Sequence, residues 1–272
     1  MARQRVEQTS RSDRRHRAGL GVLAALALAV ALAATPPATR AADPTPEPTP
    51  SPASTAAPGA TPAAPTAAPR TSTIYRSDTV VLQYAKTWCV PASAQTMANL
   101  VLGRSDRTYA TQKSLGARVR SYNAYTYTSA GNDVRGWAGA LNWVLPDSLP
   151  VVYRDRSYGS RSAAITAIVG ALDRTGYPVG IVVRRGTHAW TVLGYRASEV
   201  PGDPASRAIL GLYVVGPLGS PSDPWPYRYM TLATFASYFT AYNEVERRVI
   251  WQGRYVIVRP EPATAGFGWT GP

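Results

Sequence analysis

Cysteine and histidine are scarce in this 272-residue chain, which has one cysteine, Cys89, and two histidines, His16 and His188. A single cysteine excludes a disulfide within the chain. Because no close cluster of acidic side chains supplements these residues at the spacing of metal ligands, the sequence predicts neither a metal site nor another cofactor. Phenylalanine is also rare, so other apolar residues, which are plentiful, would fill the core.

Lysine is nearly absent, since the chain has two lysines and 27 arginines, and its formal net charge is +13. The part of the sequence expected to fold has no run of basic residues and no nucleic-acid-binding motif, so a nucleic-acid partner is not expected. Attraction of the basic surface to an acidic cell-wall polymer or to anionic lipid stays open.

Residues 1–41 have the three parts of a secretory signal peptide. A basic region that includes His16 precedes an apolar run from Ala18 to Ala34, and small residues follow, with cleavage most simply placed after Ala41. The apolar run is slightly shorter than the ~20 residues that a spanning helix needs. We therefore expect bacterial export to a secreted, cell-surface or cell-wall location. An uncleaved membrane anchor is the alternative, and it is the one way in which we expect the chain to meet a membrane.

Three further regions follow the expected signal peptide. Residues 42–72 are nearly all proline, alanine, threonine, serine and glycine, a composition that predicts a disordered linker. Residues 73–260 are sufficient for one domain with its own core. Residues 261–272 are expected to form a C-terminal tail.

Within residues 73–260, helices are expected before strands. The pattern predicts a short strand or extended lead-in over 79–84, then helices over 89–103, 108–121 and 132–145, a strand over 150–154 and a helix over 160–176. Strands are predicted over 178–183, 188–195, 209–215 and 249–259, with one late helix from Thr231 to Tyr242. This order predicts an α+β fold in which an N-terminal helical part packs on a mostly antiparallel sheet.

Cys89 lies at the start of a predicted helix whose first turn contains Pro91. The free N–H groups and the dipole of a helix N-terminus favour an anion such as a thiolate. Gln83, six residues upstream, could donate a hydrogen bond to an oxyanion, and His188 could act as the base of a thiol nucleophile. The alternatives are that Cys89 is a buried small hydrophobe and that His188 is structural.

The stretch "QYAKTWCVPASAQTMANLVLG" resembles the nucleophile region of papain-like cysteine peptidases. More narrowly, it is similar to the bacteriocin-leader-processing type, cysteine peptidase family 39, and to its stand-alone secreted relatives. "GTHAWTVLGY" resembles the histidine motif of that family, and "LYVVGPLG" and "YRYMTLATFASYF" resemble the segments that follow. The resemblance covers roughly Ile74 to Pro260 and implies a papain-like fold.

The resemblance implies a role for each matching residue. Cys89 would be the nucleophile and His188 the general base, and the Gln83 side-chain amide would form an oxyanion hole with the Cys89 N–H. The implied reaction is hydrolysis of a peptide bond in a peptide or protein substrate, through a thioester intermediate.

One position departs from the family pattern. Where the family has an Asp or Asn that orients the histidine, this chain has Gly216. Asp223 is the nearest acidic candidate downstream, although its place before Pro224 also suits a turn. Three functions therefore remain: an active peptidase, an inactive peptidase-like binding module at the cell surface, and a wall amidase or transglutaminase-type acyl transferase.

Overall fold

The structure, a computed structural model, describes residues 69–127, 131–200, 203–220, 222–243 and 249–263. The predicted signal peptide, and the predicted linker up to residue 68, lie outside these residues. So does most of the predicted C-terminal tail. In the described part, no helix is both long enough and apolar enough to cross a membrane.

The chain folds as an α+β domain with a seven-stranded sheet in which every recorded strand pairing is antiparallel. The sheet order is β2-β7-β3-β4-β5-β6, and β1 pairs with β4 beyond the end of β3. The strands are β1 (Arg70–Thr73), β2 (Val151–Tyr158), β3 (Val179–Val183), β4 (His188–Val200), β5 (Asp203–Val215), β6 (Arg228–Thr231) and β7 (Tyr255–Pro262).

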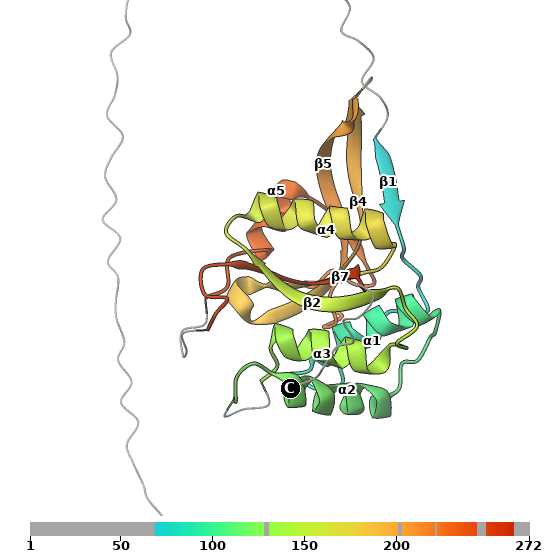
Figure 1. Cartoon of the computed structure of the whole chain (residues 1–272), viewed down its shortest axis with the longest axis vertical. Coiled ribbons are helices and arrows are strands. Elements are labelled where there is room, and N and C mark those ends of the chain that lie inside the picture. Colours follow the sequence, from blue (N-terminus) through green and yellow to red (C-terminus); the bar gives the residue numbers. More distant parts are fainter. Residues whose placement is uncertain (1–68, 128–130, 201–202, 221, 244–248, 264–272) are drawn as a thin grey trace, which may run out of the picture. The chain divides into compact units, whose positions relative to one another are not determined.

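Helices cover both faces of this sheet (Figure 1). Three of them, α1 (Cys89–Leu102), α2 (Tyr109–Tyr122) and α3 (Val134–Val144), pack on one face, and α4 (Arg161–Thr175) and α5 (Leu232–Tyr238) pack on the other. Because side chains alternate along a strand, Val182 of β3 belongs to the core under α1–α3, whereas Ile181 and Val183 belong to the core under α4 and α5. The expected helical part thus packs on the sheet, and the later helices cover its opposite face.

Individual residues at the helix termini explain where α1 and α4 begin or end. Gly103 and Gly176 follow α1 and α4 in the left-handed conformation, with φ of 64° and 67°. Ser160 caps α4 because its hydroxyl accepts a hydrogen bond from the Ala163 N–H. These positions explain why the ends of α1 and α4 were predictable from the sequence.

The lead-in segment, residues 79–84, forms no strand: Thr79 lies in a turn and Tyr84 in a bend, and side chains rather than another strand bind much of its backbone. The Val81 N–H donates to Thr96 Oγ1 at 3.0 Å, and the Tyr84 N–H donates to Gln112 Oε1 at 2.8 Å. Gln112 Nε2 in turn donates to the Leu82 carbonyl at 3.0 Å. The partners lie on α1 and α2, so the segment is fixed against the helices.

Several predicted boundaries require correction. The last three residues of the predicted linker belong to β1, which pairs with β4, and β7 extends into the predicted tail as far as Pro262. The predicted strand over 249–259 begins only at Tyr255, because residues 249–254 form turns in which Gly253 has a φ of 71°. The late helix ends at Tyr238, after which Thr240 and Asn243 bond to the backbone of Arg185.

Candidate active site

Cys89 is the first residue of α1 and is partly buried against the core beneath that helix. The residue before it, Trp88, provides no side-chain cap, and the first turn has no acidic residue. The N–H groups of this turn are therefore available to a negative charge on the cysteine sulfur. One turn further along α1, Ser93 Oγ donates to the Ala189 carbonyl at 3.4 Å, which ties the helix to β4.

His188 is the first residue of β4, and only 7% of it is exposed. Its Nε2 atom lies 3.1 Å from Asp223 Oδ1, and its ring lies near enough to Cys89 for that residue to influence its pKa. Burial lowers the pKa of His188, but the hydrogen bonds to Asp223 and Cys89 and the attraction of their charges raise it from 6.5 to about 9. The imidazole is therefore protonated at neutral pH.

Asp223 supplies the acceptor that the sequence pattern lacks at position 216. It is 1% exposed, and its carboxylate accepts hydrogen bonds from Trp190 Nε1 at 2.6 Å and from the Leu218 N–H at 2.7 Å as well as facing His188. Burial raises the pKa of this carboxyl, but the bonds from His188, Leu218 and Trp190 lower it overall. Asp223 therefore stays ionised and fixes the orientation of the imidazole ring, whose Nε2–H points at its carboxylate. Its place before Pro224 also makes it part of a turn, since its N–H donates to the Ser220 carbonyl at 2.9 Å.

Gly216 leaves the space that Asp223 occupies. A Cβ atom on Gly216 would lie 2.2–2.4 Å from the three carboxyl atoms of Asp223. The Gly216 N–H also donates to the Pro224 carbonyl at 2.8 Å, which holds the Asp223 turn against β5. An orienting side chain at 216 and the observed Asp223 are thus mutually exclusive.

Trp190 is a site residue that the sequence analysis did not single out. Its indole is fully buried, donates to the same Asp223 oxygen that faces His188, and meets the His188 ring edge to face at 6.4 Å. A signal for it was present, because residues i and i+2 of a strand point to the same side. The pattern His-x-Trp at the start of a strand could therefore have indicated this contact.

Gln83 lies in the lead-in segment, and its N–H donates to the Pro217 carbonyl at 2.8 Å. Its side-chain nitrogen donates to the Ala85 and Lys86 carbonyls at 2.9 Å and 3.0 Å, while its buried amide oxygen has no hydrogen-bond partner. Both amide hydrogens are thus directed at carbonyls of the loop before Cys89. Donation to a substrate oxyanion requires the amide to leave at least one of these carbonyls.

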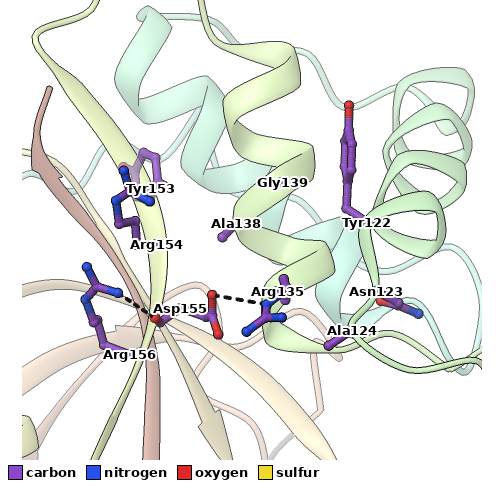
Figure 2. A pocket seen from close by; sticks show the side chains of 10 residues that line it. All are labelled: Tyr122, Asn123, Ala124, Arg135, Ala138, Gly139, Tyr153, Arg154, Asp155 and Arg156. Atoms are coloured by element: carbon purple, nitrogen blue, oxygen red, sulfur yellow. Dashed lines mark hydrogen bonds and ion pairs between the residues drawn. The ribbon is translucent and has the colours of Figure 1, made fainter. Parts of the chain in front are cut away.

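A cavity of about 560 Å³ lies apart from these residues, between the end of α2, α3 and the edge strand β2 (Figure 2). Arg135 and Asp155 face each other on one side of the cavity, with 3.8 Å between Arg135 Nε and Asp155 Oδ1, and Tyr122 lies on the other side. None of the residues that line it is Cys89, His188, Asp223 or Gln83. The described residues contain no group of three or more metal-binding side chains.

No family model matches the chain, and no curated protein matches its sequence. The geometry of the site places a cysteine at a helix N-terminus, an imidazole and a carboxylate in series.

Proposed function

We propose that this chain is an exported cysteine peptidase with a papain-like fold, similar to the bacteriocin-leader-processing type. The observation that carries the proposal is the series Cys89–His188–Asp223, in which one imidazole interacts with both the cysteine and the carboxylate. A nucleophile, a base and an orienting carboxylate are the three groups that acyl transfer by a thiolate requires. The proposal of export rests on the sequence of residues 1–72.

In the proposed reaction, the Cys89 thiolate attacks the carbonyl carbon of a peptide bond, and negative charge develops on the carbonyl oxygen. The Cys89 N–H, at the start of α1, is one donor for that oxyanion, and the Gln83 amide is the second once it leaves the loop carbonyls. Protonated His188 then gives its proton to the leaving amine, and a thioester forms. Water, deprotonated by His188, attacks the thioester and releases the acid and the free thiolate.

One observation favours the alternative of a binding module without activity. Because the Gln83 amide donates to Ala85 and Lys86, the second oxyanion donor is not directed at a substrate in this structure. Loss of one such donor typically costs about 2.7–4 kcal/mol of transition-state stabilisation. A slow peptidase and an inactive module therefore differ in whether this amide is released when a peptide binds. A wall amidase or transglutaminase-type acyl transferase would use the same three residues and differs in its substrate.

The test is alkylation of Cys89 in the folded protein, combined with peptide hydrolysis. We expect iodoacetamide to label the wild-type protein well below the ordinary thiol pKa of about 8.5, and we expect His188→Ala to abolish that labelling while leaving the fold intact. Peptide-library hydrolysis lost in Cys89→Ala supports the peptidase. Labelling only near the ordinary thiol pKa, with no hydrolysis, supports the binding module, and fast labelling without hydrolysis of peptides points to an acyl transferase.

A further inference from the structure

The turn between β3 and β4 has an unusual backbone for its sequence. Arg184, Arg185 and Gly186 have φ values of 54°, 61° and 105°, and the two arginines are the non-glycine residues with positive φ in the described part of the chain. Left-handed backbone places Cβ too close to the neighbouring carbonyl oxygen, so glycine would be less strained at both positions. His188 follows immediately after this turn and Thr187.

The surrounding residues hold the strained backbone in place. The Arg185 N–H donates to Thr240 Oγ1 at 2.9 Å, and the Arg185 carbonyl accepts from the Asn243 N–H at 2.9 Å. The ring of Tyr242 fills the space beside Gly186, since a Cβ there would lie 2.8 Å from it. Strain that is fixed so firmly beside a reactive group is typical of functional sites.

The two arginines differ in what their side chains do. The Arg184 guanidinium donates to the Ser222 carbonyl at 2.8 Å and lies 5.9 Å from the centre of the Tyr238 ring, so it supports the turn that contains Asp223. The Arg185 side chain is exposed, and within the described residues no hydrogen bond or ion pair holds its guanidinium. The contacts of its side chain explain why position 184 is an arginine. No such contact among the described residues explains an arginine at 185, where any side chain strains the left-handed backbone.

We propose that Arg185 binds a carboxylate of the substrate and makes the site selective for acidic peptides. This inference rests on the proposed peptidase function. Guanidinium groups bind carboxylates through paired N–H donors, and the Arg185 guanidinium, which has no partner among the described residues, lies three residues before His188 in the sequence. The carboxylate belongs either to a Glu or Asp side chain or to the C-terminus of a peptide.

The test uses pairs of peptidyl acyloxymethyl ketones, which label an active thiolate, differing only in Glu or Gln at one position. In the full-length wild-type protein we expect the Glu probe of one pair to label Cys89 about ten- to a hundredfold faster, as for a hydrogen-bonded charge pair. Arg185→Ala and Arg185→Gly abolish this preference, whereas Arg185→Lys keeps part of it. Competing peptides with a free or an amidated C-terminus distinguish the two sources of the carboxylate.

Thermal unfolding adds a readout that a structural role would not produce. Because glycine relieves the left-handed strain, Arg185→Gly is expected to raise the Tm by about 2–4 °C while it loses the Glu preference. Arg228→Gln, which removes another exposed arginine, on β6, leaves both properties unchanged. Equal labelling by Glu and Gln probes, or a preference that survives in Arg185→Gly, overturns the inference alone. Failure of the Gln probes to label wild-type Cys89 contradicts the peptidase proposal itself.

Discussion

At the residue scale, the carboxylate that faces His188 comes from position 223 and not from position 216, where the family pattern has its orienting side chain. The carboxylate that faces His188 comes from the turn after β5, at Asp223, and the strand position that would otherwise supply an orienting side chain is Gly216. The two are linked because a side chain at 216 would collide with Asp223. From the sequence alone, Gly216 suggests that the residue which orients the histidine is missing. In the structure, the absence of a side chain at 216 leaves the space in which the Asp223 carboxylate faces His188.

Asp223 can be tested by two substitutions that differ in what they keep. Asp223→Asn retains an oxygen that accepts from His188 and Trp190 but loses the charge, so the pKa of His188 should fall and kcat should drop about tenfold or less. Asp223→Ala removes the acceptor and leaves the imidazole unoriented, with an expected loss in kcat of about a hundredfold or more. Steady-state hydrolysis measures both. Equal activity of Asp223→Ala and wild type would contradict an orienting role.

The steric link between positions 216 and 223 can be tested by reversing the two residues. Gly216→Ala should displace the Asp223 carboxylate, lower activity and reduce the free energy of unfolding by about 1–3 kcal/mol. Gly216→Asp combined with Asp223→Gly moves the carboxylate to the position that the family pattern uses, so the double variant should be more active than Gly216→Asp alone. A double variant no better than that single variant would refute the steric link between the two positions.

The residues of the site were predictable to different degrees. Cys89 and His188 could be found because residue type and rarity point to them, and the structure brings them together. Asp223 was a weak candidate because its side chain reaches His188 only through a turn whose shape the sequence does not specify. The Gln83 position was found, but the carbonyls that now receive its amide hydrogens belong to a loop that pattern reasoning does not resolve.

At the element scale, buried amide and hydroxyl side chains of α1 and α2 replace strand pairing for the lead-in segment. The run of apolar residues in "TVVLQY" suits a strand, but the side chains of Gln112, Thr96 and Asn99 bind its backbone groups instead. Such bonds between residues distant in the chain carry no periodic signal. For this reason the helices and the central strands were predictable, whereas this segment was not.

Thr96 offers a clean test of this arrangement. Thr96→Val keeps the shape of the side chain but leaves the buried Val81 N–H without its acceptor, so the free energy of unfolding should fall by about 1–3 kcal/mol. Thr96→Ser is the control, because it keeps the hydroxyl. Urea unfolding measures both variants. A Thr96→Val protein as stable as Thr96→Ser would show that this bond does not hold the segment.

At the scale of the whole molecule, the site lies where helix α1 meets the sheet. Cys89 begins a helix that packs on one face of the sheet, His188 begins a central strand, and Asp223 lies in the connection from β5 to β6. The relative position of these three residues therefore depends on the packing of α1 against β4. The α+β class was predictable from the order of elements, but the covering of both faces was not, since it depends on which strands pair.

The charge of His188 also connects the site to global stability. A histidine pKa raised from 6.5 to about 9 on folding contributes stability that is fully present below about pH 6.5 and is lost as the pH rises through about 9. Urea unfolding of wild type and His188→Gln should therefore show a stability difference that is largest near pH 6 and shrinks toward pH 10. A difference that does not change with pH would mean that His188 gains no favourable partners on folding.

The most direct measurement is an NMR titration of the His188 ring in a His16→Gln background, which leaves one histidine to observe. We predict an apparent pKa of about 9 that falls in both Cys89→Ala and Asp223→Asn, because each removes a charge that stabilises the imidazolium. A pKa at or below the ordinary 6.5 that neither substitution changes would contradict an imidazole that interacts with both Cys89 and Asp223.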